Sequence, residues 1–420
     1  MKKSVSFLFG VFLLSGCASV ATSNLMQVRQ SFAHDDFIKS ADKFANSADI
    51  QSQDSLELLI SGLSQFQAKD YIQSDNTFEE FNKRNYDTDG GSIIRETKSL
   101  IGGQLVNEYK PYMMDSLFVS YYQIWDALGR NKPDDVRVII NQSYARQQNM
   151  SRAYADMVEK TNEKMSNESA SELMTELQKR NAQWAAYTDI MNPALMYLSG
   201  IWFLNNGDFN DAETYLKRAT GMVPNNSWIK TDLKLAENNQ KPTNTTWVFI
   251  ESGFAPILRE ESISLPVPLG NSIGWVSIAI AEPEFNNNHL SIYGAQSLAD
   301  VNAMFMTEFN QYRTNDALRA FVSASARAVA QATAYNSGSK YSGLLGLGAT
   351  LFSLSTTNAE VRSWVTLPES ISVMRLNTAN LIDSNLSATL GTDVKLPKSG
   401  NYLIYVRLTE SAPIVHMFKI

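Results

Sequence analysis

The sequence predicts helical repeats in the N-terminal half of the chain and a mixed α+β domain in the C-terminal half. From residue 32 to residue 239, apolar residues recur at spacings of three and four, which is typical of amphipathic helices. A polar stretch with one proline follows at 240–246, and beyond it come short β-rich runs bounded by glycine and proline. One helical segment also has the spacing of a tetratricopeptide-like (TPR-like) repeat. We therefore expect an α-solenoid-like domain at 32–239, a linker at 240–246 and an α+β domain at 247–420.

The first seventeen residues resemble the export signal of a bacterial lipoprotein. Lys2 and Lys3 precede an apolar run at 5–14, and small residues then lead to Cys17. The run is shorter than the roughly 20 residues that cross a bilayer, so we expect residues 1–16 to be a signal peptide that is cleaved. The thiol of Cys17 would then accept a diacylglyceryl group, with palmitate among its acyl chains, and anchor the chain in a membrane. Cys17 is the only cysteine in the chain, which argues against disulfides and thiolate metal sites.

The residues after Cys17 indicate where the anchor is sorted. Ala18 stands where an aspartate commonly retains lipoproteins at the inner membrane, and this pattern resembles that of outer-membrane lipoproteins in Gram-negative bacteria. Residues 17–31 are mostly small and polar, and we interpret them as a lipidated tether. We expect a protein that faces the periplasm, with exposure on the cell surface as the alternative. The net charge of -7 argues against nucleic acid as a partner.

The clearest repeat signal lies at 200–224. The positions that match a TPR-like repeat are Gly200, Phe203, Gly207, Phe209, Ala212, Ala219 and Pro224. Gly200, Ala212 and Ala219 would let two antiparallel helices approach, and the two phenylalanines would fill the space between them. Gly207 would make the turn, and Pro224 would end the second helix. Ser199 departs from the pattern, because the family usually has a large apolar residue there. A generic helical hairpin is the alternative.

Further elements follow from the same periodicities. A weaker copy of the repeat is predicted at 59–81, and a third helix pair at 117–128 and 134–158. In the C-terminal half a helix is predicted at 298–335. Strands are predicted at 247–251, 262–267, 274–281, 363–367, 371–376, 402–409 and 414–420.

One segment between predicted helices has the oxygen-ligand spacing of a calcium-binding EF-hand loop. Its candidate ligands are Asn85, Asp87, Asp89 and Glu96. In such a loop alternating side chains converge on the ion, and the last glutamate binds with both oxygens. Asn85 replaces the usual first aspartate, so a polar turn between helices is the favoured interpretation and calcium is the alternative.

Residues typical of catalytic sites are sparse. The three histidines, His34, His289 and His416, have no metal-ligand spacing, and we expect them to be structural or solvated. The sequence has no nucleophile elbow, phosphate loop or zincin helix. We therefore expect no enzymatic activity and no cofactor.

Three blocks of sequence resemble a poorly characterised group of Gram-negative outer-membrane lipoproteins. They are EYKPYMMDSLFVSYYQIWDALGRNKPDDVRVIINQSYARQQ at 108–148, WVFIESGFAPILREESISLPVP at 247–268 and AEVRSWVTLPESISVMRL at 359–376. The resemblance implies a TPR-like N-terminal half and a β-containing C-terminal half. It also implies a gene context beside lipoproteins that resemble activators of penicillin-binding proteins. It implies no enzymatic activity and supplies no catalytic residues.

These observations favour an interaction protein. Stacked helix pairs form a concave surface, and we expect a protein or peptide partner on it, in envelope assembly or in the control of peptidoglycan synthesis. A first alternative is a subunit of an outer-membrane export or surface-assembly machine that oligomerises through 317–354. A second is a carbohydrate-binding or hydrolytic module that stacks sugars on Trp247, Trp275 or Trp364, although tryptophans in strands usually belong to the core.

Overall fold

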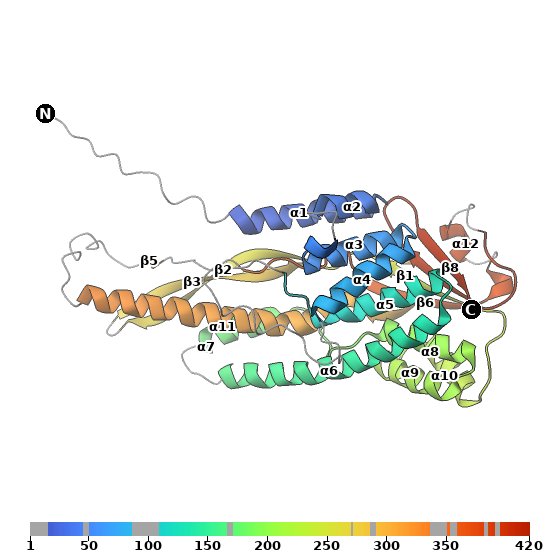
Figure 1. The fold of residues 1–420 in the computed structure, drawn as a ribbon. Coiled ribbons are helices and arrows are strands. Elements are labelled where there is room, and N and C mark those ends of the chain that lie inside the picture. Colours follow the sequence, from blue (N-terminus) through green and yellow to red (C-terminus); the bar gives the residue numbers. More distant parts are fainter. Residues whose placement is uncertain are drawn as a thin grey trace.

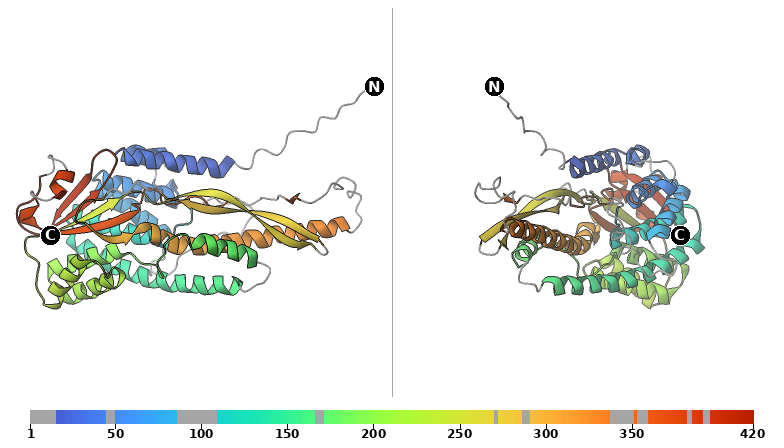
Figure 2. Two further views of the ribbon diagram at one scale, coloured as in Figure 1. Left: turned by 180° about the vertical axis from the view of Figure 1, so that it is seen from behind. Right: turned by 60° about the vertical axis from the view of Figure 1, so that its left-hand side comes forward.

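A layer of helices packs on one face of a five-stranded sheet, and a long arm projects from one end of these layers (Figures 1 and 2). The computed structural model describes residues 16–44, 50–85, 109–165, 171–269, 272–285, 291–336, 351–352, 359–381, 385–390 and 395–420. Helices and strands are both present, so the mixed α and β composition predicted from the sequence is confirmed. Among these residues no helix has the length and apolar character needed to cross a membrane.

Helices dominate the chain up to residue 237. They are α1 Gly16–Ala33, α2 Phe37–Phe44, α3 Ser55–Gln67, α4 Tyr71–Asn85, α5 Met113–Gly129, α6 Pro133–Met165, α7 Ser171–Asn181, α8 Pro193–Asn206, α9 Phe209–Met222 and α10 Ser227–Glu237, with a 3₁₀ turn at Ile50–Ser52. The three predicted helix pairs fall on α3 and α4, on α5 and α6, and on α8 and α9. Within each pair the two helices are consecutive and pack against each other.

The helix ends follow from local sequence. Asp54 caps α3 by accepting hydrogen bonds from the backbone N–H groups of Leu56 (2.8 Å) and Glu57 (2.9 Å). The Glu57 carboxylate accepts one in return from the Asp54 N–H at 2.7 Å, which completes a capping box. Gly207 ends α8 with φ = 85°, a left-handed conformation that glycine adopts without strain.

The five-stranded sheet has the order β4-β6-β1-β7-β8. Its strands are β1 Thr245–Ser252, β4 Gln296–Asp300, β6 Ser370–Asn377, β7 Tyr402–Arg407 and β8 Ile414–Lys419. The central strand β1 pairs in parallel with β7 and antiparallel with β6, which places Phe249 opposite both Tyr405 and Val373. These positions confirm the strands predicted at 247–251, 371–376, 402–409 and 414–420.

The predicted strand at 363–367 is wrong. This segment forms turns and irregular backbone, although Trp364, Val365 and Leu367 are all buried. Its backbone meets the end of β1 through isolated hydrogen bonds, among them Ala255 N–H to the Leu367 carbonyl at 2.8 Å. A short apolar run looks the same in sequence whether a strand or an irregular segment buries it, and periodicity cannot separate the two.

Both faces of the sheet are covered. Alternate residues of β1 point to opposite sides, so Trp247 and Phe249 join the core beneath the helices, while Val248 and Ile250 join a smaller core. That smaller core also contains Leu386 from the short helix α12, Asn385–Leu390. The full burial of β1 agrees with the unbroken apolar run at 247–250 in its centre.

The first helix of each pair packs directly on the sheet. Trp125 of α5 lies edge-on to Phe249 of β1 with 5.4 Å between ring centroids, and Phe66 of α3 lies edge-on to Tyr405 of β7 at 4.9 Å. Tyr197 of α8 reaches Phe249 at 5.8 Å. Residues from both sides of the predicted linker therefore share one apolar core. The predicted division into two domains stays a prediction, to be tested by unfolding.

The segment predicted as a polar tether, 17–31, lies entirely within helix α1. Leu25, Val28 and Phe32 are buried along one side of this helix, at the three- and four-residue spacing of a helical face. The many small polar residues between them concealed this face in the sequence. The helix packs on α2 and on the first residues of the arm.

Candidate interaction surface on the arm

The arm is a hairpin of two long strands packed on a long helix. It consists of β2 Ile257–Leu269, β3 Ser272–Glu284, β5 Leu351–Phe352, α7, and α11 Val301–Asn336 from Arg313 onward. With 13 residues the strands are about 43 Å long, and with 36 residues α11 is about 54 Å long. The arm has its own core, built from Leu173, Met174, Leu177, Ile263, Leu265, Val267, Val276, Ile278, Ile280, Ala317, Leu318, Phe321, Ala324 and Ala328.

Charged groups hold the root of the arm together. Arg313 of α11 is buried and its guanidinium lies 2.7 Å from the Glu282 carboxylate of β3. Arg180 of α7 contacts the same carboxylate at 2.7 Å and also pairs with Glu176 (2.8 Å) and Glu261 (3.0 Å). Burial lowers the pKa of Arg313, and the Glu282 carboxylate opposes that shift. One partly buried glutamate therefore joins the hairpin to both helices of the arm.

The helix α11 continues from the arm into the body of the protein. There the buried Glu308 carboxylate accepts hydrogen bonds from the backbone N–H groups of Met113 (2.8 Å) and Met114 (3.2 Å), at the start of α5. A carboxylate at a helix N-terminus is favoured by the free N–H groups and by the helix dipole. The Tyr187 N–H also donates to the Thr307 hydroxyl at 2.8 Å. These contacts fix the direction in which the arm leaves the body.

The outer face of the hairpin is apolar near its tip. Pro266, Pro268, Ile273 and Trp275, which we call the tip patch, share the face that points away from α11. The register pairs Pro266 with Trp275 and Pro268 with Ile273. Ile273 is 69 % exposed and Trp275 is 50 % exposed. Large apolar side chains exposed together at the end of a projection are typical of an interaction surface.

Two stretches of the arm contain no acidic residue. Residues 262–281 of the hairpin carry no charge, and residues 317–336 of α11 carry only the charges of Arg319 and Arg327. The chain as a whole has 43 acidic and 36 basic residues, so these stretches differ sharply from the rest. The tip patch was not predicted as a site, but the charge-free run that contains it was visible in the sequence.

Two buried polar clusters hold the body together. In the first, the Glu251 carboxylate of β1 accepts hydrogen bonds from Tyr122 (3.1 Å) and Tyr405 (2.7 Å) and pairs with Arg407 of β7 at 3.1 Å. All four side chains are buried. Burial raises the pKa of Glu251, and Arg407 and the hydrogen bonds oppose that shift. This cluster ties α5 to the centre of the sheet.

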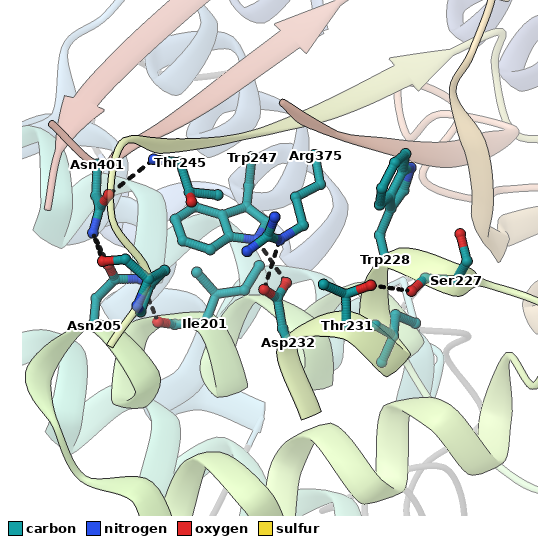
Figure 3. Close-up of polar contacts among 12 residues, drawn as sticks. Ile201, Asn205, Ser227, Trp228, Thr231, Asp232, Thr245, Trp247, Arg375 and Asn401 are labelled. Atoms are coloured by element: carbon teal, nitrogen blue, oxygen red, sulfur yellow. Dashed lines mark hydrogen bonds and ion pairs between the residues drawn. The ribbon is translucent and has the colours of Figure 1, made fainter. Parts of the chain in front are cut away.

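Figure 3 shows the second cluster, around Asp232 of α10. Its carboxylate accepts hydrogen bonds from the Trp247 ring N–H (2.7 Å) and the Arg375 guanidinium (2.8 Å). It also accepts one from the Tyr197 hydroxyl at 2.6 Å. Asp232 and Tyr197 precede the predicted linker, whereas Trp247 and Arg375 lie in the sheet. Burial raises the pKa of Asp232, and the neighbouring Arg375 opposes that shift most strongly. Since each of its partners belongs to the core or its edge, we interpret this cluster as structural.

The predicted repeat residues lie together where α8 meets α9. Gly200 faces Leu216 so closely that an added Cβ would be 2.7 Å from the Leu216 Cγ. Ala212 and Ala219 are buried and Phe209 is partly buried, while Pro224 lies in the turn after α9. Phe203 stacks on Tyr215 with centroids 5.4 Å apart.

The other predicted sites are placed only in part. Cys17 is at the start of α1, in its first turn. Asn85 ends α4, where its side-chain amide donates to the Ser55 hydroxyl (3.1 Å) and to the Phe81 carbonyl (2.8 Å). The remaining calcium candidates, Asp87, Asp89 and Glu96, lie outside the described residues.

His416 is buried in an aromatic setting. Its ring stacks on Phe66 with centroids 4.6 Å apart, and its Nδ1 lies 3.0 Å from the Tyr71 hydroxyl. Burial lowers the pKa of His416 to about 3, and the positive charge of Lys69 adds to that shift.

This shift predicts a loss of stability in acid. The unfolded chain takes up a proton on His416 near its ordinary pKa of 6.5, whereas the folded protein stays neutral there until about pH 3. The free energy of unfolding therefore falls as the pH drops from 6.5 towards 3, and His416 contributes roughly 2 kcal/mol of that loss by pH 5. Urea unfolding at pH 7 and pH 5 should show a smaller loss for His416→Phe than for the wild type. Equal losses in the two proteins would contradict the prediction.

Comparison with known proteins found no relative: no family model, no curated protein and no solved structure matches this chain.

Proposed function

We propose that the protein is a lipid-anchored scaffold of the cell envelope, held in the outer membrane by lipid on Cys17 and facing the periplasm. The observation that carries this proposal is the arm, because a rigid projection with an exposed apolar end is suited to binding another molecule or surface. The export signal and Ala18 support the anchor and its sorting. The resemblance to envelope lipoproteins supports a role in envelope assembly or in the control of peptidoglycan synthesis.

The structure changes where a protein partner is expected. In a solenoid of helix pairs, the inner helices line the concave surface that holds a partner. Here the inner helices α3, α5 and α8 are covered by the sheet of the same chain, as the contacts of Phe66, Trp125 and Tyr197 show. We propose that the helix pairs are diverged TPR-like repeats whose concave side is filled by this sheet. A protein partner then binds the outer helices α4, α6 and α9.

The anchor is tested by replacing Cys17 with serine. The hydroxyl of serine is a much weaker nucleophile than a thiol, so the variant should incorporate no labelled palmitate and should leave the membrane fraction of a Gram-negative host. Ser23→Ala, on α1 but outside the signal, serves as the control and should stay labelled and membrane-bound. Palmitate labelling of Cys17→Ser equal to that of the wild type would contradict the proposed anchor.

A second candidate function is a subunit of an export or surface-assembly machine. One observation favours it: Val322 and Val329, seven residues apart on α11, are 62 % and 45 % exposed. Exposed apolar residues at this spacing lie on one side of a helix and are suited to packing against a second helix. Light scattering in detergent separates the two functions, because a strict monomer contradicts the assembly subunit.

The three tryptophans considered for sugar stacking differ in their exposure to solvent. Trp247 and Trp364 are buried in the core and cannot stack on a ligand, whereas Trp275 is half exposed. The sugar-binding alternative would therefore have to rest on Trp275.

A further inference from the structure

We propose that the tip patch of the arm, Pro266, Pro268, Ile273 and Trp275, lies against the surface of the lipid bilayer. The patch would be a second, non-covalent point of attachment to the membrane. This inference rests on the proposed function for the anchor at Cys17, and it names the partner of the arm.

The composition of the patch suits the boundary between headgroups and acyl chains. Tryptophan is enriched at this boundary because its ring is apolar and its N–H is polar. Ile273, 69 % exposed, adds apolar surface next to it. Residues 317–336 of α11 carry Arg319 and Arg327 and no acidic residue. This positive charge on the arm favours its approach to anionic headgroups.

The two prolines argue against a protein strand as the occupant. In the arm sheet, of order β2-β3-β5, β2 is an edge strand. Proline has no N–H, so a proline in a paired strand occupies a position whose amide would face the open edge. Pro266 and Pro268 thus remove two neighbouring donors from the edge nearest the tip, which hinders pairing with a further strand from another chain. A lipid surface needs no backbone hydrogen bonds from the edge.

The direction of the arm agrees with a membrane contact. The start of α1, which carries Cys17, and the tip of the arm point away from the body on the same side (Figures 1 and 2). The Thr22 hydroxyl donates to the Leu258 carbonyl at 3.4 Å, so α1 is attached to the base of the hairpin. The anchored residue and the tip of the arm therefore lie on the same side of the body.

The experiment uses the chain from residue 17 with Cys17→Ser, so that neither the lipid nor the native thiol is present. In this background Ile273→Cys is labelled with the polarity-sensitive dye NBD. Ile72→Cys on α4, where the isoleucine is 64 % exposed, is the matched control on the body. The probe is a vesicle of phosphatidylethanolamine and phosphatidylglycerol at roughly three to one. The expected result is a several-fold rise in NBD emission at position 273 with vesicles and no rise at position 72.

A second measurement needs no label. Vesicle sedimentation of Ile273→Ser/Trp275→Ser should show partitioning reduced by at least about tenfold, because two large apolar side chains are lost from the contact. Ile72→Ser should partition like its parent, and circular dichroism of both variants confirms that they are folded.

Three outcomes would overturn the proposal. The first is no emission change at position 273 at any lipid concentration, and the second is equal changes at positions 273 and 72. The third is emission at position 273 that rises with protein concentration in the absence of lipid, together with a doubling of the molecular mass. The last would assign the patch to a second copy of the chain. Palmitate labelling of the wild type judges the anchor separately, so a failure of the tip contact is distinguishable from a failure of the proposed function.

Discussion

Replacing Arg407 with alanine should lower the free energy of unfolding by roughly 3–5 kcal/mol, because the Glu251 carboxylate is then left buried without its counter-charge. Both side chains are fully buried, so water cannot replace the lost partner. The guanidinium also donates to the Gly253 carbonyl at 2.8 Å, and this acceptor would be orphaned as well. Urea unfolding monitored by circular dichroism measures the loss.

Two comparisons separate a coupled pair from a general loss of packing. Arg259 pairs with Glu284 on the surface with both side chains about half exposed, so Arg259→Ala should cost no more than about 0.5 kcal/mol. The double variant Glu251→Gln/Arg407→Met should be more stable than the summed losses of the single variants Glu251→Gln and Arg407→Met predict, because no unpaired charge remains. Strict additivity would show that Glu251 and Arg407 are not coupled.

Replacing Trp125 with alanine should also cost about 3–5 kcal/mol, since it leaves a large cavity in the core. Trp125 is fully buried on α5 and contacts Phe249, Tyr405 and Phe418 from three strands of the sheet. A loss at this position should therefore weaken helices and sheet together. We expect hydrogen-exchange protection to fall both in α8 and in β1, which lie on opposite sides of the predicted linker.

The matched control is a tryptophan at the root of the arm. Trp184 is 40 % exposed and lies beside Phe285 with centroids 4.2 Å apart, so Trp184→Ala should cost about 1 kcal/mol or less. If Trp125→Ala lowered protection in α8 and left β1 unchanged, the two sides of the linker would be independent domains. That outcome would support the division predicted from the sequence.

Local structure was predictable where one periodicity dominates. The three-and-four spacing located the helix pairs, and Gly207 marked the end of α8 because its left-handed φ of 85° is favourable for glycine. The apolar run at 363–367 gave a wrong strand prediction, because an apolar pattern indicates burial and does not specify the backbone conformation. Trp364 is buried although its backbone is irregular.

The shared core was not predicted, although α8 carried a signal for it. Residues 193–206 contain no charged side chain, and a helix that is apolar all round is buried on every side. An inner solenoid helix that lined an open concave surface would have a polar face. The sequence could not show that the sheet covers the second side of α8, because Phe249, which contacts Tyr197, lies in a strand that begins about fifty residues later.

The candidate site was harder to predict than the fold. A strand pattern at 274–281 places Trp275 on one face of a strand but does not say whether that face is covered. Likewise, Glu251 and Arg407 stand out as charges inside apolar strands, and a buried charge requires a partner. Their separation of 156 positions along the chain hides the pairing, which follows only from the parallel register of β1 and β7.

The attachment of α1 determines how the protein would bear a mechanical load. A pull on the start of α1 reaches the fold through bonds spread along the helix. The Thr22 hydroxyl bonds to Leu258, the Arg29 guanidinium to the Ala255 carbonyl at 3.3 Å, and the Ala33 carbonyl accepts from Glu410 at 3.2 Å. Bonds distributed along the direction of pull share the force, whereas bonds at a peeling end break one at a time. The helix would therefore resist as a sheared joint and transmit tension to the base of the hairpin before it detached.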